Sequence, residues 1–206
     1  MRWLFRLIGI LLIMTAISIF FWNDIRTYFT ERVNDKVIES YENNNQRVKV
    51  NPIESWITKT DANQLKSNDH MVGYLKVPSA DISEPIFKGP ATEKNLRNGL
   101  SLVDKGEQLN EQNIAIAGHR VEGTGIRFNN LTRAKVGDKV ELITFNKRKT
   151  YKITEIKNVK PTQVDVLEEH KGKPNQLTLI TCDTYNPETL LFEERMIYTA
   201  VEEKTA

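Results

Sequence analysis

Hydrophobic and polar positions follow three successive patterns along the chain: one uninterrupted apolar run, one amphipathic stretch, and then many short apolar segments. The apolar run covers residues 7–22 without a charge, and residues 3–6 lengthen it to about twenty residues. A helix of that length spans about 30 Å, the thickness of the hydrocarbon core of a bilayer. Trp3 and Trp22 flank the run, as aromatic residues do at membrane interfaces. The pattern predicts a transmembrane anchor over residues 1–24.

A cleaved signal peptide is the alternative interpretation of this segment. A cleavage site needs small residues, but the run ends in Phe20, Phe21 and Trp22, which favours an uncleaved anchor. The basic residues do not decide the orientation of the anchor, because arginines precede the span and further basic residues follow it.

A helical stem is predicted after the anchor, over residues 25–68. Apolar residues recur at spacings of three and four over residues 25–41, which indicates an amphipathic helix that continues out of the membrane. Asn51 and Pro52 then supply an N-cap and a proline at the first helical position. We interpret both helices as spacers and expect Trp56 to dock the second helix on the domain that follows. The expected apolar face of the second helix consists of Ile53, Trp56 and Ile57.

From about residue 70 onward, short apolar segments alternate with turns, and the region 69–206 is predicted to be one domain. Many strands and few helices at this length indicate an all-β fold, a closed or nearly closed β-barrel. Short helices are expected at residues 92–97 and 128–134, and residues 146–149 are expected to form a hairpin loop. The strand candidates are residues 72–77, 84–87, 113–117, 138–145, 150–159, 176–182 and 195–201.

Charge and cysteine content then narrow the possible functions. The net charge is +2, from 29 basic and 27 acidic residues, which argues against a nucleic-acid partner. The single cysteine, Cys182, has no partner for an intramolecular disulfide, although an anchored domain outside the membrane would be in an oxidising environment. This thiol is therefore either buried and inert or a nucleophile. One cysteine and three scattered histidines lack the spacing of a zinc site.

Strand alternation places Cys182 on the outer face of its strand. Over residues 176–182, Leu177, Leu179 and Thr181 share the face expected to point into the core. Cys182 shares the opposite face with Thr178 and Ile180, so its sulfur is expected at the outward end of the strand.

Two further groups near strand ends complete a candidate catalytic set. His119 directly follows a strand candidate that ends in small residues, and Arg195 opens the last strand candidate. A thiolate can attack a carbonyl carbon, an imidazole can transfer protons, and a guanidinium can stabilise an oxyanion. The sequence pattern alone leaves other interpretations open: Cys182 as a small buried hydrophobic residue, His119 as a loop residue and Arg195 as a surface charge.

The motifs around these residues resemble those of the sortase family. The segment from Leu177 to Cys182 is similar to the Thr-aliphatic-Thr-Cys motif of sortases, and Ile116 to His119 is similar to their Ala-Gly-His motif. Arg195 matches the arginine of the family. The segments 160–162 and 89–92 strengthen the resemblance, which covers residues 70–202 and is closest to the class A housekeeping enzymes of the staphylococcal type.

The resemblance implies a fold, an activity and a location. The fold would be the sortase β-barrel, and the activity would be cleavage of a Leu-Pro-x-Thr-Gly sorting signal between Thr and Gly. The surface protein would then pass to an amine of a peptidoglycan precursor, of the lipid II type. Cys182 would be the nucleophile, His119 the general acid and base, and Arg195 the stabiliser of the oxyanion or the substrate. The N-terminus would be cytoplasmic, the enzyme would be held in the cell membrane, and the catalytic domain would be extracellular.

The resemblance also implies a substrate groove and a calcium site. Residues 161–174 would form a mobile loop that closes over the bound peptide. No cofactor would be required for the chemistry, but Ca²⁺ would act as an activator, since carboxylates suit this hard cation. The positions matching the groove are Ala91, Ala115, Ala117, Val164, Val166, Leu167, Thr178 and Ile180. The positions matching the calcium ligands are Asp104, Glu107, Glu111 and Glu169.

Two alternative functions are weighed against this one. A pilin-polymerising sortase would join protein subunits, but such enzymes often carry a lid segment, and none is evident before the barrel. A non-catalytic surface-binding domain on a stalk would leave Cys182 inert. A weak homodimer is a further partner that the sequence leaves undecided.

Overall fold

The computed structural model describes residues 2–44, 48–60, 65, 70–120, 126–186, 188 and 191–203. Within these residues, eight strands form a closed barrel in the order β1-β2-β3-β4-β7-β8-β6-β5. The β2–β3 and β4–β7 pairs are parallel, and the other neighbours are antiparallel. The strands are β1 (Met71–Val77), β2 (Ile82–Phe87), β3 (Leu100–Leu102), β4 (Asn113–Ala117), β5 (Lys139–Ile143), β6 (Arg148–Val159), β7 (Gln176–Asn186) and β8 (Leu191–Glu202).

The predicted β-barrel is confirmed, and its interior is filled by apolar side chains that alternate along the strands. Leu177 and Leu179 of β7 are fully buried with Ile114 and Ile116 of β4 in this core. The spacing of two that predicted the inward face therefore holds for both strands. β3 was not predicted, because a segment of three residues is too short to show a period.

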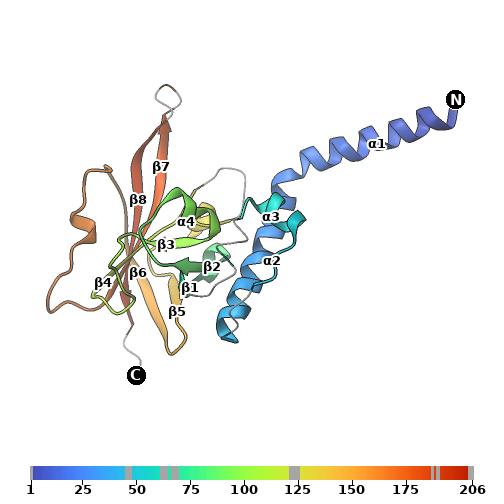
Figure 1. The fold of residues 1–206 in the computed structure, drawn as a ribbon. Coiled ribbons are helices and arrows are strands. Elements are labelled where there is room, and N and C mark those ends of the chain that lie inside the picture. The colour runs from blue at the N-terminus through green and yellow to red at the C-terminus, as the bar shows by residue number, and fades with distance from the viewer. Residues whose placement is uncertain are drawn as a thin grey trace.

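The helices lie outside the barrel (Figure 1). They are α1 (Arg2–Phe20), α2 (Trp22–Glu42), α3 (Pro52–Thr58) and α4 (Glu93–Asn98), with 3₁₀ turns η2 (Pro78–Ala80), η3 (Asn129–Arg133) and η4 (Asp165–Leu167). The helix expected at residues 92–97 is α4, with Thr92 as its N-cap. The helix expected at residues 128–134 is the shorter 3₁₀ turn η3.

Helix α1 extends away from the barrel and is the one helix of the described chain that is long and apolar enough to cross a membrane. It is consistent with a single-pass membrane anchor. The limits proposed for the anchor, the stem and the catalytic domain at residues 24 and 68 stay a prediction.

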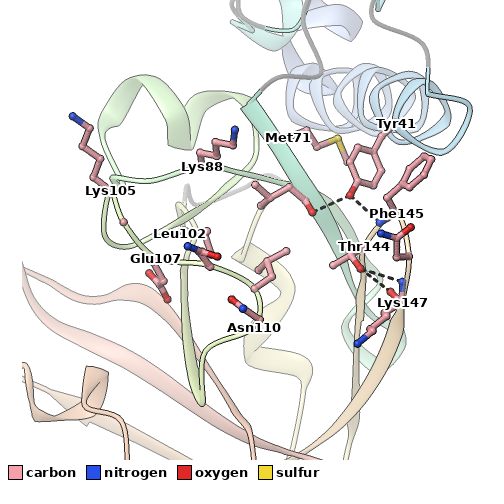
Figure 2. A pocket seen from close by; sticks show the side chains of 15 residues that line it. Tyr41, Met71, Lys88, Leu102, Lys105, Glu107, Asn110, Thr144, Phe145 and Lys147 are labelled. Atoms are coloured by element: carbon pink, nitrogen blue, oxygen red, sulfur yellow. Dashed lines mark hydrogen bonds between the residues drawn. The ribbon is translucent and has the colours of Figure 1, made fainter.

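The stem is not only a spacer, because α2 packs against the barrel. Val33, Val37 and Ile38 of α2 form one buried cluster with barrel residues that include Tyr74 and Ile143. At the end of α2, the Tyr41 hydroxyl donates to the Val72 carbonyl and accepts from the Phe145 N–H, both at 2.9 Å (Figure 2).

Helix α3 begins as the sequence predicts, but it docks differently. The Asn51 side chain accepts from the Glu54 N–H, and the Glu54 carboxylate accepts from the Asn51 N–H, which is a capping box. Lys36 of α2 lies 2.6 Å from the Glu54 carboxylate and ties α3 to α2. Trp56 does not dock on the barrel: it is 71% exposed and packs edge-on against Trp22, with ring centroids 5.8 Å apart.

Candidate active site

Strand register brings Cys182 and Arg195 side by side. The two residues are direct partners in the antiparallel β7–β8 pair. Side chains of directly opposed residues point to the same face of a sheet and lie within about 5.5 Å at their Cβ atoms. The guanidinium and the thiol therefore start from neighbouring positions on the outer face of the barrel.

The parallel pairing of β4 with β7 brings His119 to the same level. Ala117 is opposite Ile180, and the Gly118 N–H continues the ladder by donating to the Ile180 carbonyl at 3.0 Å. His119 and Cys182 each lie two residues beyond the Ala117–Ile180 pair. Since neighbouring strands are about 4.8 Å apart, the backbone of His119, just past the end of β4, is expected to lie close to that of Cys182 in β7. The three predicted catalytic residues thus belong to three adjacent strands at one level. His119 follows the end of β4, whereas Cys182 and Arg195 lie inside β7 and β8, which continue to Asn186 and begin at Leu191.

The local sequence around Cys182 keeps the sulfur out of the core. Leu177, Leu179 and Thr181 are buried in the barrel, as alternation predicts. Cys182 is a free cysteine of intermediate exposure. The interpretation of Cys182 as a sealed, inert hydrophobic residue is therefore not supported by its position.

Gly118 allows the chain to place His119 close to the barrel wall. A Cβ at Gly118 would lie 2.5 Å from a ring carbon of Phe128 and 2.7 Å from a methyl carbon of Leu100. Contacts this short do not occur between real side chains, so this position needs glycine. The Phe128 N–H also donates to the His119 carbonyl at 3.1 Å, which holds the backbone of the histidine next to Phe128.

Glu93 contacts the imidazole and was not found from the sequence. Its Oε2 lies 3.0 Å from His119 Nε2, and its Oε1 lies 3.2 Å from Arg97 Nε. The hydrogen bond from Arg97, followed by the charge of His119, holds the pKa of Glu93 below its usual value despite partial burial. Glu93 belongs to α4, far from His119 in sequence, and its only local signals are the N-cap Thr92 and the i,i+4 pair with Arg97.

Arg195 is held by the backbone of its own strand. Its Nη1 donates to the carbonyls of Phe192 at 3.2 Å and Glu194 at 3.0 Å. These contacts fix one edge of the guanidinium against the backbone of β8. The planar guanidinium carries five N–H donors, so the group retains donors for an additional acceptor.

Several of the predicted groove positions lie together beside the catalytic end. On the outer surface of β4 and β7, Ala115 lies next to Thr178 and Ala117 lies next to Ile180. Each pair therefore combines a small side chain of β4 with a larger one of β7. The segment 160–175 covers part of this surface, because the Val166 carbonyl accepts from the Asn113 side chain at 3.0 Å. Val166 and Leu167 are half-buried, Val164 is exposed, and Ala91 lies before α4 with its N–H donating to the Val103 carbonyl.

The predicted calcium ligands lie on two neighbouring segments. Glu107 is half-buried and accepts from the backbone N–H groups of Val103, Asp104 and Ala115. The residues described here contain no group of three or more Asp, Glu, His or Cys side chains arranged to hold a metal ion.

The other carboxylates of this set also accept backbone N–H groups. Glu111 accepts from the Gln108 N–H at 2.9 Å, and Glu169 accepts from the Gln112 N–H at 2.9 Å. The bond to Gln112 holds the loop that carries Glu169 next to the segment that carries Glu111.

A cavity of about 720 Å³ lies between the end of α2, residues 105–110 and the β5–β6 hairpin (Figure 2). Lys88, Lys105 and Lys147 are among its lining residues, and Glu107 is the one predicted site residue there. The catalytic set is not part of this cavity.

Comparison with known proteins gives one consistent family. The family described as "Sortase domain" matches residues 75–203. Sortase A of Staphylococcus aureus (strain NCTC 8325 / PS 47) is 40% identical over 207 residues, which cover 98% of this chain and 99% of that protein. Sortase A of Streptococcus agalactiae (serotype III, strain NEM316) is 34% identical over 220 residues, covering 99% of this chain and 85% of that protein. The solved structure of sortase A from Listeria monocytogenes has a TM-score of 0.58 at 30% identity, covering 66% of this chain and 89% of that one.

Proposed function

This chain belongs to the sortase family, and we propose that it cleaves a Leu-Pro-x-Thr-Gly sorting signal and joins the cleaved protein to an amine of a peptidoglycan precursor. Its similarity to sortase A over nearly the whole chain makes it a cysteine transpeptidase of that type. The finer assignment is supported above all by the register that sets Cys182 between His119 and Arg195. The substrates would be surface proteins that carry the signal.

The first half-reaction would form a thioester. The Cys182 sulfur attacks the carbonyl carbon of the Thr residue, and the Thr–Gly C–N bond breaks as the tetrahedral intermediate collapses. His119 gives a proton to the leaving Gly amine. Arg195, the strand partner of Cys182, would donate to the oxyanion as charge develops on it.

The second half-reaction would release the product. The incoming amine attacks the thioester carbonyl, His119 takes up the proton of that amine, and the C–S bond breaks to return Cys182 as the free thiolate or thiol. Glu93, 3.0 Å from the imidazole, would hold the ring in place.

The outer face of β4 and β7 would bind the Leu-Pro part of the signal. Ala117 and Ile180 are partly exposed on this face, which suits apolar side chains of the signal. Ala115 and Thr178 are buried beneath the 160–175 segment, so this segment would have to move for the peptide to reach them. The segment 161–174 would close over the peptide, with Val164, Val166 and Leu167 facing it and Ala91 at the opposite side.

The proposed location is the cell membrane, with α1 as a single span. The N-terminus would be cytoplasmic and the barrel extracellular, as the resemblance implies. This orientation would place the catalytic end where surface proteins and lipid-linked wall precursors meet.

Calcium is proposed as an activator that is not part of the chemistry. The donor set of Asp104, Glu107, Glu111 and Glu169 is made only of carboxylates, which fits a hard cation. Burial raises the pKa of Glu107, and the nearby charge of Glu111 raises it further, so a cation there would relieve the repulsion. Bound Ca²⁺ would tie the loop that carries Glu169 to the segment before β4.

Calorimetry of the full chain in detergent tests this site. The unmodified protein should bind Ca²⁺, and Glu169→Gln should weaken binding because it removes the ligand supplied by the loop. Absence of heat from both proteins would refute the site.

Incubation with a Leu-Pro-x-Thr-Gly peptide and an oligoglycine amine tests the activity. Mass spectrometry should show the peptide cut after Thr and joined to the oligoglycine, and Cys182→Ala should give neither product. Transfer only to a lysine side chain of a pilin-type protein would indicate a pilin-polymerising sortase. A native Cys182 that resists thiol reagents, with no cleavage, would indicate a non-catalytic surface domain.

A further inference from the structure

A second cavity, of about 380 Å³, lies between the stem and the catalytic end of the barrel. Arg26 of α2 and Lys59, the C-cap of α3, line it on the side of the stem. Arg97 of α4 and His119 line it on the side of the barrel. This cavity thus joins the segment that follows the membrane helix to the proposed catalytic histidine.

The lining of this cavity has an excess of positive charge. Arg127 is paired with Glu84, and Arg97 is paired with Glu93 at 3.2 Å. Neither Arg26 nor Lys59 has an ion-pair partner within the described part of the chain. Within the part of the chain that the structure describes, these two cations on the stem side therefore lack an ion-pair partner.

The guanidinium of Arg26 contains a buried donor without an acceptor. Its Nε is inaccessible to solvent and has no hydrogen-bond partner among the described residues. Buried N–H groups are almost always paired, and a charged one that is unpaired is costly. Guanidinium groups pair well with the oxygens of carboxylates and phosphates, so this donor indicates an anionic ligand in the cavity.

The position of the cavity indicates where this anion comes from. Arg26 lies six residues after the end of α1, which corresponds to about 9 Å along a helix. Trp22 and Trp56 pack together with 40% and 71% exposure, and Ile53 is 66% exposed. Exposed tryptophans of this kind are typical of the headgroup layer of a membrane. Figure 1 shows α3 beside the junction of α1 and α2. Arg26 and Lys59 line the cavity, so it lies close to this junction.

We propose that this cavity binds the phosphate of an anionic membrane lipid. Arg26 would donate its Nε–H to a phosphate oxygen, and Lys59 would add a point charge at the rim. Binding would hold the stem and the end of the barrel that carries His119 at the membrane surface. This inference rests on the stem residues and does not depend on the transpeptidase assignment.

Titration of the full chain in dodecyl maltoside with dihexanoyl phosphatidylglycerol tests the proposal by calorimetry. The unmodified protein should bind this lipid saturably and more tightly than dihexanoyl phosphatidylcholine. Arg26→Gln should weaken binding at least about tenfold, as expected for the loss of a charge-assisted hydrogen bond. Lys59→Gln should weaken it less. Arg133→Gln, the same change at an exposed arginine outside the cavity, should leave it unchanged.

Several results would overturn the proposal. One is the absence of saturable lipid binding by the unmodified protein. Another is an equal loss of lipid affinity in Arg26→Gln and Arg133→Gln, which would indicate a general attraction between charges. Inorganic phosphate that binds as tightly as the lipid, with the same response to the variants, would overturn the lipid as the source of the anion.

Thermal unfolding without lipid separates binding from folding. Arg26→Gln should not lower the midpoint, because the Nε donor has no partner to lose. If it does, Arg26→Lys decides the matter, since lysine keeps the charge but lacks the Nε–H. Unchanged lipid binding by Arg26→Lys would then refute the proposal.

Discussion

The buried ion pair between Arg127 and Glu84 is expected to control both stability and catalysis. The two residues are 3% and 4% exposed. Nη1 of Arg127 donates to the Glu84 carboxylate and to the Asn34 side chain, the latter at 3.1 Å, and Nη2 donates to the Arg97 carbonyl at 2.6 Å. One guanidinium therefore connects β2, the stem helix α2 and helix α4.

Glu84→Gln removes the negative charge and leaves the guanidinium buried. Loss of one partner of a buried pair typically costs about 3–5 kcal/mol, because the other charge is left uncompensated. We expect the low end of this range, since Asn34 and the Arg97 carbonyl still accept from Arg127. For a chain of this length, a loss of about 3 kcal/mol lowers the thermal midpoint by roughly 6–12 °C.

A double-mutant cycle tests the reasoning. Arg127→Met also removes one partner but keeps a side chain at a backbone φ of 58°, so it adds no new strain relative to arginine. Glu84→Gln combined with Arg127→Met should be less destabilised than the sum of the single changes by about 1–3 kcal/mol. Additive effects, or a single loss below about 1 kcal/mol, would show that the pair is not what stabilises this junction.

The same change should affect turnover through His119. The Phe128 N–H donates to the His119 carbonyl, and Arg127 precedes Phe128, so loosening Arg127 weakens the hydrogen bond that holds the His119 backbone. In Glu84→Gln, kcat for the peptide transfer should fall while KM stays nearly constant, measured at a temperature where the variant is folded. A rise in KM with kcat unchanged would contradict this link.

Three further changes address the catalytic end directly. Arg195→Ala should lower kcat about 10²–10³-fold, as for other oxyanion donors, and a loss below tenfold would reduce it to a substrate contact. Glu93→Gln should lower kcat about tenfold at neutral pH, where the carboxylate that contacts His119 is ionised. Hydrogen bonding holds the pKa of Glu93 below 4.5, so the kcat values of the variant and the unmodified enzyme should converge only below that pH. A ratio of the two kcat values that stays constant across a pH series would refute the role. Gly118→Ala should unfold at lower temperature and lose activity, since its Cβ would overlap Phe128, and wild-type melting would contradict the close contact.

The features predictable from the sequence are those set by local spacing. The inward face of β7 follows from alternation over seven residues, and the start of α3 follows from the Asn51 cap and Pro52. Pairing between distant strands is not local. The sequence pattern alone therefore left Cys182, His119 and Arg195 as separate candidates. The resemblance to sortases grouped them into one site, and the strand pairing in the structure places their backbones on adjacent strands.

Contacts between segments account for what the sequence did not predict. Glu93 has no spacing relation to His119, because α4 reaches the imidazole only after the barrel has closed. Trp56 was expected to dock the second helix on the barrel, but here it packs against Trp22. Trp22 begins α2 and Trp56 lies in α3. The spacing of apolar residues within one helix does not indicate which other helix its apolar face contacts.

Alternation along a strand predicts a face, but it does not predict what covers that face. Thr178 lies on the outer face of β7 and is nonetheless fully buried, because its hydroxyl donates to the Asn113 side chain at 2.7 Å and the segment with Val166 lies over it. Cys182, on the same face, is outside this cover and stays partly exposed. The outer face of β7 thus changes from a covered surface to a partly exposed thiol within four residues. Under the proposed function, a peptide held by the 160–175 segment would reach the sulfur where the cover ends, as cleavage by Cys182 would require.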